Sequence, residues 1–165
     1  MSKPAGPYRI LFVCLGNICR SPAAQSIMNT LITTHKLNHL LMVDSAGTER
    51  YNIGMLSDAR MRSAGGRRNH IFDHRARQFQ TSDFDAFDLI LAMDKDNLRE
   101  IRNLARSSED EAKTALFLEH CQVCADAEVP DPYYGGAEGF EDVLDMLEEG
   151  CHNLVQQIIP RLKPV

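Results

Sequence analysis

Residues 9–22 are Arg9-Ile10-Leu11-Phe12-Val13-Cys14-Leu15-Gly16-Asn17-Ile18-Cys19-Arg20-Ser21-Pro22, an apolar run followed by a short loop and the start of a segment of helical periodicity. The apolar run has the length and composition of a buried strand. Ser21 is predicted to be the helix N-cap and Pro22 the first helical residue. The stretch therefore predicts a strand, a loop and a helix N-terminus in direct succession.

The loop has the parts of an anion-binding site. Backbone N–H groups at a helix N-terminus bind a dianion such as phosphate, sulfate or arsenate, and Gly16 is expected to take dihedral angles that other residues resist. The planar guanidinium of Arg20 can grip two oxygens of that anion. Cys14 would lie beneath it, where the same positive groups favour the thiolate. The loop thus predicts a nucleophile held under a bound phosphorus.

An ordinary buried cysteine at a strand–helix turn is the alternative interpretation of Cys14. A Cys six residues before an Arg is weak evidence by itself. The strand before the loop, the Gly16-Asn17 pair within it and Ser21-Pro22 after it all agree with an anion-binding geometry. These agreements favour the anion-binding loop.

Two motifs resemble those of the low-molecular-weight protein tyrosine phosphatases. The signature C-x-G-N-x-C-R-S is present from Cys14 to Ser21, and the D-P-[WYF] motif is present as Asp131-Pro132-Tyr133. The resemblance runs from about Tyr8 to about Leu162. It implies a phosphatase that hydrolyses phosphotyrosine and other aryl phosphate monoesters through a cysteinyl-phosphate intermediate, with no metal or other cofactor.

The resemblance also implies roles for individual residues. Cys14 would attack phosphorus, and Arg20 would bind the phosphate and stabilise the transition state. The Ser21 hydroxyl would stabilise the Cys14 thiolate as a leaving group. Asn17 would hold the strained loop, and Ser45 and His74 match the positions that hold Asn17. The phosphate-binding loop then comprises Leu15, Gly16, Asn17, Ile18, Cys19 and Ser21 between and beside the two catalytic residues.

Asp131 is the predicted general acid and then general base. It lies between Pro130 and Pro132, which restrict the backbone, and a carboxyl group there is suited to protonate the leaving oxygen. The same carboxylate can later take a proton from the attacking water. A rigid surface turn is the alternative for a Pro-Asp-Pro stretch considered alone.

Tyrosine side chains are expected to form the substrate walls. Tyr51 and either Tyr133 or Tyr134 could flank a flat aromatic ring, although each could equally be a half-buried packing residue. A family branch that acts on phosphoarginine tends to carry Thr at the position of Ile18. The resemblance therefore favours phosphotyrosine as the substrate.

The remaining cysteines allow two further interpretations. The resemblance suggests that Cys19 protects Cys14 by forming a reversible disulfide, whereas the alternative is simple packing against the sheet. A zinc site could be drawn from His120-Cys121-Gln122-Val123-Cys124 and Cys151-His152. Cys151 lies within an apolar helical stripe, however, and this favours a core thiol.

Composition bounds the function classes. The 165 residues, of which 44% are hydrophobic, predict a single domain over 1–165 with its core at about 8–162. The net charge of −5 argues against nucleic acid as a partner, and neither a signal peptide nor a membrane insertion is expected. Several free thiols favour the cytoplasm. The oligomeric state is left open, with a monomer expected, and phosphate-like oxyanions are expected to inhibit.

One basic cluster departs from the acidic balance. It contains Arg60, Arg62, Arg67, Arg68, Arg75 and Arg77. Such a cluster is usually a solvated surface with its own ion pairs, and the alternative is that it steers anionic phosphopeptides.

Alternating periodicities predict the fold. Strand-like runs occupy 8–13, 39–44, 87–93 and 114–118, and helix-like runs occupy 22–35, 57–64, 95–106 and 138–160. This order predicts a doubly wound α/β domain of three α/β/α layers around a four-stranded parallel sheet. Sites in such folds lie beyond the carboxyl ends of the strands, where Cys14 and the 44–48 loop would meet.

Two other functions remain as alternatives. An arsenate reductase on the same scaffold would need a cysteine relay, and the chain has no cysteine between Cys19 and Cys121. A non-catalytic phosphotyrosine-binding module would have no need of Cys14, Arg20 and Asp131 together.

Overall fold

A four-stranded parallel sheet forms the centre of the molecule. The structure is a computed structural model that describes residues 6–123 and 128–162. Its strands are β1 (Tyr8–Cys14), β2 (Leu41–Gly47), β3 (Leu89–Ala92) and β4 (Thr114–Leu116), and their order in the sheet is β2-β1-β3-β4. Every neighbouring pair is parallel. The predicted doubly wound α/β architecture is confirmed.

Helices connect the strands, as parallel pairing requires. They are α1 (Arg20–Thr34), α2 (Ala59–Gly66), α3 (Asp83–Ala86), α4 (Lys95–Asn103), α5 (Ser108–Ala112), α6 (Phe117–His120), α7 (Ala137–Ile158) and the 3-10 helix η1 (Ile159–Arg161). The four longer helices were predicted, whereas α3, α5, α6 and η1 are too short to show helical periodicity. Strand β2 begins and ends later than its predicted range of 39–44.

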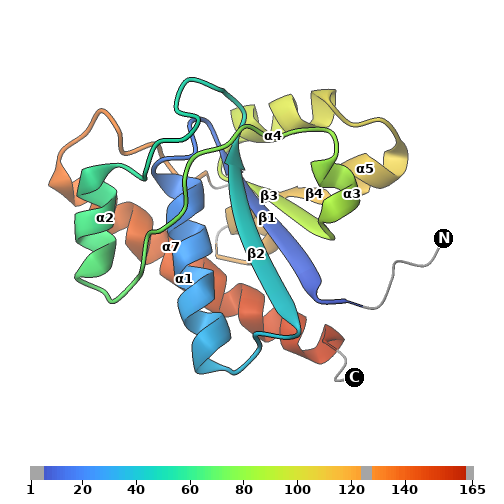
Figure 1. Cartoon of the computed structure of the whole chain (residues 1–165), viewed down its shortest axis with the longest axis horizontal. Coiled ribbons are helices and arrows are strands. Elements are labelled where there is room, and N and C mark those ends of the chain that lie inside the picture. The colour runs from blue at the N-terminus through green and yellow to red at the C-terminus, as the bar shows by residue number, and fades with distance from the viewer. Residues whose placement is uncertain (1–5, 124–127, 163–165) are drawn as a thin grey trace.

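Two apolar cores cover the faces of the sheet. Along β1, Ile10 and Phe12 point into the larger core, which α1 and α7 complete, while Leu11 and Val13 point into the smaller core beside α3 and α4. All four side chains are fully buried. Figure 1 shows α1, α2 and α7 on one side of the sheet and α3, α4 and α5 on the other. The alternation fixes the register of β1 and hence the position of its last residue, Cys14.

The strand order places a crevice at the end of β1. The chain passes from β1 to β2 on one side and later to β3 on the other, so the direction of winding reverses at β1. Ligand sites in such sheets lie beyond the carboxyl ends of the strands at this reversal. Cys14 ends β1, and the residues that follow β3 lie at the same edge.

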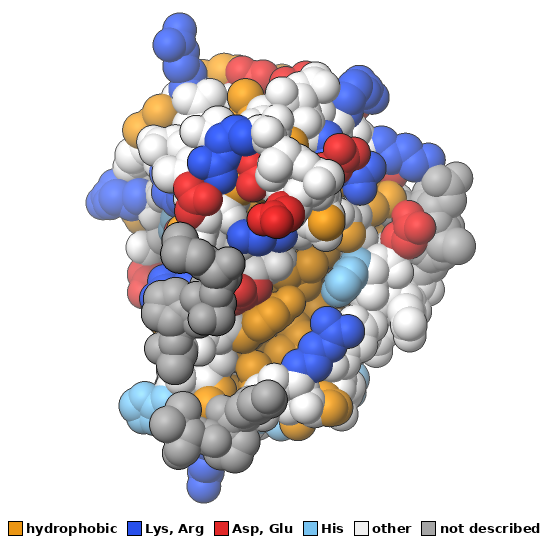
Figure 2. Space-filling model, turned by 90° about the vertical axis from the view of Figure 1, so that its right-hand side faces the viewer, with side chains coloured by type: hydrophobic (Ala, Val, Ile, Leu, Met, Phe, Trp, Pro, Cys, Tyr) orange, Lys and Arg blue, Asp and Glu red, His pale blue; other side chains and the backbone are white. Residues whose placement is uncertain are grey.

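The surface shows mixed charge. Figure 2 shows a face on which basic and acidic side chains surround a hollow lined by apolar side chains. Within the described parts of the chain, no helix is long and apolar enough to cross a membrane.

Candidate active site

The loop between β1 and α1 is built as a cradle. Carbonyl groups along it accept hydrogen bonds from surrounding segments: Cys14 from Thr48 N (2.9 Å), Leu15 from Glu49 N (3.0 Å), Gly16 from Asn52 Nδ2 (3.2 Å) and Ile18 from Asp58 N (2.8 Å). Because the carbonyl and the N–H of a planar peptide point in opposite directions, outward carbonyls leave N–H groups directed inward. The carbonyl contacts therefore agree with a backbone cradle at the start of α1, and anion binding there stays a prediction.

The start of α1 differs from the prediction. The helix begins at Arg20 and its N-cap is Cys19, so Ser21 is not the N-cap and Pro22 is not the first helical residue. The Ser21 hydroxyl lies 3.0 Å from Cys14 Sγ and 2.8 Å from Asn17 Nδ2. It is engaged with the loop, which explains why it does not cap the helix.

Gly16 has a different role from the one predicted. The positive φ of the loop belongs to Asn17, at 57°, and Gly16 does not adopt one. A Cβ at Gly16 would lie 2.5 Å from Asn52 Nδ2. A side chain at Gly16 would have to displace the Asn52 amide, so glycine leaves room for Asn52 to donate to the Gly16 carbonyl. Asn52 was missed because the sequence carries no signal for this contact.

Cys14 is held by donors. Its side chain is buried, and the Asn17 N–H donates to its sulfur at 3.3 Å. The Ser21 hydroxyl lies 3.0 Å from the same sulfur and also lies 3.4 Å from the Ala46 carbonyl, so the sulfur and this carbonyl are both acceptors within its reach. The Cys14 sulfur therefore has a backbone N–H and a hydroxyl group within hydrogen-bond reach.

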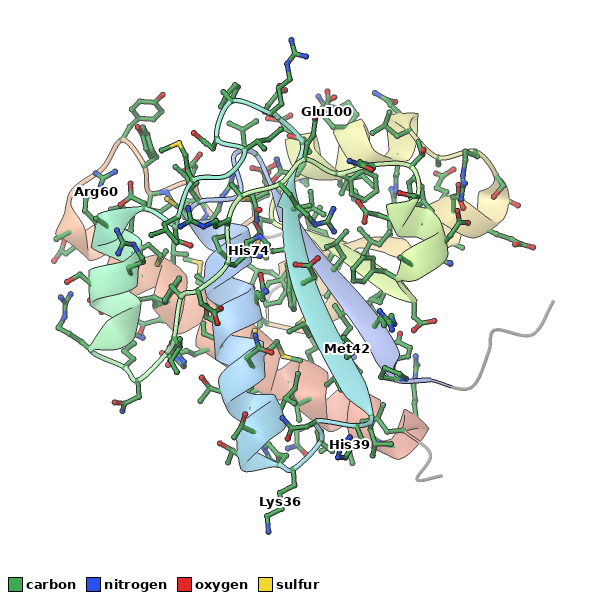
Figure 3. All side chains as sticks on the ribbon, in the orientation of Figure 1. Lys36, His39, Met42, Arg60, His74 and Glu100 are labelled. Carbon is green, nitrogen blue, oxygen red and sulfur yellow. The ribbon has the colours of Figure 1, made fainter. Side chains whose placement is uncertain are left out.

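The side chain of Asn17 organises the loop. Its Nδ2 also donates to Ser45 Oγ (2.9 Å), and its Oδ1 accepts from His74 Nε2 (2.9 Å) and from Arg77 N (3.0 Å). Ser45 and His74 are thus brought to Asn17, as the resemblance implied, and the Arg77 contact is new. Burial lowers the pKa of His74, although the nearby Asp44 opposes this. Figure 3 shows His74 between the top of α1 and β2.

Arg20 is buried and fixed by a carboxylate that the sequence analysis missed. Its Nη1 donates to Asp94 Oδ2 at 2.6 Å and to the Val129 carbonyl at 3.0 Å, and its Nη2 lies 3.6 Å from Asp131 Oδ2. Asp94 is also the N-cap of α4 and accepts from Asn97 N at 2.8 Å. Its position just after β3, at the carboxyl edge beside β1, was the available signal.

Asp131 lies at the same pocket as Cys14 and Arg20. Its side chain is 37% exposed, and its Oδ1 accepts from the Tyr133 N–H at 3.1 Å. The pocket is lined by Cys14, Leu15, Gly16, Ile18, Cys19, Arg20, Tyr51, Asn52, Asp131, Tyr133 and Tyr134. The two motifs, far apart in the sequence, meet here.

The three tyrosines form an exposed rim. Tyr51 is 65%, Tyr133 42% and Tyr134 93% exposed, so the alternative of a half-buried packing residue stays open for Tyr133 alone. The rings of Tyr133 and Tyr134 meet edge to face with centroids 4.9 Å apart.

Three of the other cysteines, Cys19, Cys121 and Cys151, are buried. Cys19 is 4% exposed, and burial raises the pKa of its thiol, as do Asp58 and Cys14. Cys121 and Cys151 are fully buried in the core, the latter in the predicted α7 stripe. Cys124 lies outside the described residues. Among those described, no group of three or more His, Cys, Asp or Glu is placed to hold a metal ion.

Members of the arginine cluster have local partners. Arg67 pairs with Glu141, Arg68 with Glu141, Asp145 and Glu148, and Arg77 with Asp44 and Asp83. Arg62 donates to the Ser57 carbonyl and Arg75 to the Gly54 carbonyl. These contacts agree with a solvated surface that has its own ion pairs.

Comparison with known proteins identifies the family. The sequence model of the low molecular weight phosphotyrosine protein phosphatases matches residues 9–163. A relative from Synechocystis, named for the same family, is 47% identical over 150 residues, which cover 91% of this chain and 96% of that protein. The chain belongs to the low molecular weight protein tyrosine phosphatases and is a cysteine-dependent phosphatase.

Solved structures agree with this assignment. A protein tyrosine phosphatase from Entamoeba histolytica superposes with a TM-score of 0.88 at 42% identity, covering 93% of this chain and 98% of its own. A Drosophila arginine phosphatase superposes with a TM-score of 0.84 at 31% identity, covering 91% and 97%. Proteins of this fold are therefore named for two different phosphorylated side chains.

Proposed function

We propose that the chain hydrolyses phosphotyrosine and other aryl phosphate monoesters through a cysteinyl-phosphate intermediate on Cys14. The single observation that carries this proposal is the pocket shared by Cys14, Arg20 and Asp131 at the start of α1. A nucleophile, an anion clamp and a proton donor are the three groups that the transfer of a phosphoryl group to sulfur requires.

In the first step, the Cys14 thiolate attacks phosphorus opposite the leaving oxygen. The phosphorus–sulfur bond forms while the phosphorus–oxygen bond breaks, and Asp131 gives its proton to the departing phenolate. Because Nη1 of Arg20 is held by Asp94 and Val129, the Nε and Nη2 edge of the guanidinium is the part that grips two phosphate oxygens. Inward loop N–H groups bind the same charge.

In the second step, water attacks the phosphorus of the intermediate. Asp131, now a carboxylate, takes a proton from that water, and the phosphorus–sulfur bond breaks to release phosphate. The electron pair returns to sulfur, and the Ser21 hydroxyl, 3.0 Å away, stabilises the thiolate that leaves. The cycle restores every group and uses neither a metal nor an oxidant.

An aromatic substrate is favoured by the walls of the pocket. The exposed rings of Tyr51 and Tyr133 can contact a flat ring bearing the phosphate. Phosphoarginine is the competing substrate, as the fold is shared with an arginine phosphatase. Ile18 stands where the phosphoarginine branch tends to carry Thr, and this supports phosphotyrosine. Comparing kcat/KM for a phosphotyrosine peptide and its phosphoarginine counterpart tests the choice.

The other functions are less well supported. An arsenate reductase needs two further thiols that can reach Cys14, whereas Cys121 and Cys151 are fully buried in the core. A silent binding module would leave Asp131 without a role beside Arg20. Inhibition by phosphate-like oxyanions, protection of Cys14 by Cys19, a monomeric state and a cytoplasmic location remain predictions.

Release of phenol from phenyl phosphate, with EDTA present, tests the proposed function. The native chain should turn over, Cys14→Ser should abolish turnover, and Asp131→Asn should slow it by about 10²-fold or more. No turnover by reduced, folded enzyme would sink the proposal. Loss of turnover in EDTA alone would instead indicate a metal-dependent reaction.

A further inference from the structure

Arg60 occupies an unusual position beside the pocket. It is the second residue of α2, and Figure 3 shows it facing the loop that precedes α7. Its Nε and Nη2 donate to the two oxygens of Asp58, at 3.1 and 2.9 Å, and Nη2 also donates to the Tyr133 carbonyl at 3.1 Å. The guanidinium lies over the rings of Tyr133 and Phe140, 5.3 and 4.7 Å from their centroids. One side chain therefore joins α2, α7 and the loop that carries Asp131.

The anchors of Arg60 are rigid. Asp58 is the N-cap of α2, and its own N–H donates to the Ile18 carbonyl in the phosphate-binding loop at 2.8 Å. Phe140 is 1% exposed and belongs to the main core. A bidentate ion pair and a buried ring leave the guanidinium little freedom.

The loop that Arg60 contacts is mostly exposed, although Pro132 within it is buried. Asp131, Tyr133 and Tyr134 all lie at the surface, and the backbone hydrogen bond from Gly135 N to the Pro132 carbonyl is internal to the loop. Tyr133 connects Arg60 to Asp131, because its carbonyl accepts from Arg60 while its N–H donates to Asp131 Oδ1. Two hydrogen bonds through the backbone of a single residue, Tyr133, thus connect Arg60 to the proposed general acid.

We propose that Arg60 is a positioning residue, which holds the Asp131 carboxyl group over the leaving oxygen through Tyr133. This inference rests on the proposed function, because it assigns a partner to its general acid. Arg60 does not line the pocket and touches no substrate atom in this scheme. Its removal should weaken proton donation and spare both nucleophilic attack and phosphate binding.

Leaving-group dependence tests the proposal. A dinitrophenolate leaves without protonation, whereas a phenolate needs the proton, so only the second reaction depends on the position of Asp131. Arg60→Gln should lower kcat/KM for phenyl phosphate about 10-fold, since small displacements of a reacting group cost one to two orders of magnitude. For a dinitrophenyl phosphate the loss should be under about twofold. In the Asp131→Asn variant, adding Arg60→Gln should cause no further loss of kcat/KM.

Control variants separate position from charge and from folding. Arg67→Gln removes an exposed arginine at the end of the same helix and should leave both reactions unchanged. Arg60→Lys keeps the charge but not the planar fork, so the phenyl phosphate defect should persist. Asp58→Asn keeps an N-cap oxygen while weakening the hold on Arg60, and should give a smaller defect of the same kind.

The outcomes are distinct. Equal losses on the two esters, no loss on either, or full restoration by Arg60→Lys would overturn the inference. If the native chain hydrolysed neither ester, the proposed function would fail. Amide hydrogen exchange at Tyr133 would then still test the contact, which predicts faster exchange in Arg60→Gln and is refuted by unchanged exchange.

Discussion

Replacing Asp94 by Asn tests how the phosphate clamp is held. Asp94 accepts from Arg20 Nη1 with one oxygen and from Asn97 N with the other. An Asn side chain has only one acceptor oxygen, so it can keep one of these contacts while its amide N–H groups face a donor at the other. Because Asn is as good an N-cap as Asp, we expect the oxygen to stay at Asn97 and the contact with Arg20 to be lost.

The expected cost follows from the burial of the pair. The side chains of Arg20 and Asp94 are 3% and 20% exposed, and their contact is 2.6 Å long. Hydrogen bonds to charged groups contribute about 1.5–3 kcal/mol, and a loss of about 2 kcal/mol corresponds to about 30-fold in kcat/KM. Since Arg20 binds the phosphate before and during transfer, the inhibition constant of inorganic phosphate should rise as well.

Steady-state release of phenol, with phosphate as competitive inhibitor, measures both quantities. Far-UV circular dichroism of Asp94→Asn without urea serves as the control for folding, because breaking a buried ion pair lowers stability even though the cap of α4 is retained. A loss below about threefold in kcat/KM, with phosphate binding unchanged, would refute the argument that Asp94 positions Arg20.

Three further changes probe the loop. Ser21→Ala should lower kcat about 10-fold or more while phosphoenzyme accumulates, as seen by rapid quench, because the leaving thiolate loses a donor; unchanged kcat would contradict this. Asn17→Ala removes four side-chain hydrogen bonds and places alanine, which has no side-chain amide, at φ 57°. Urea unfolding should show that the free energy of unfolding falls by about 3 kcal/mol or more, and a fall of less than about 1 kcal/mol would contradict this. Burial lowers the pKa of His74, so the unfolded state binds more protons and stability should fall as pH drops below about 6.5; His74→Gln should flatten this slope in urea titrations from about pH 7 to about pH 5, and an unchanged slope would refute the assignment.

The sequence predicts this fold well where periodicity is strong. Residues 10–13 alternate between two buried faces, and the α7 stripe from Phe140 to Ile158 is buried as its spacing indicates. Single-turn helices such as α3 and α6 give no such signal, because four residues cannot display a repeat. The presence and type of the long elements were therefore predictable, whereas their ends and the short connections were not.

Residues of the site were likewise predicted only where a sequence motif marks them. Cys14, Arg20 and Asp131 belong to motifs, and their meeting in one pocket was expected. Asn52 acts through a contact set by tertiary packing, so no local pattern marks it, whereas Asp94 could have been found from its position just after β3. The helix start was misjudged because Ser21 and Pro22 suit a cap by local preference, whereas the Ser21 hydroxyl bonds within the loop instead.

The proposed reaction transfers the phosphoryl group to the Cys14 sulfur before water releases it. Native enzyme mixed with phenyl phosphate and quenched during turnover, followed by peptide mass analysis, locates any covalently bound phosphoryl group. One phosphoryl group is expected on the peptide that contains Cys14. Its occupancy should increase in Asp131→Asn when a dinitrophenyl phosphate is the substrate, because that leaving group needs no proton whereas the attacking water lacks its base. Steady turnover with no labelled peptide, or with the label on another residue, would contradict it.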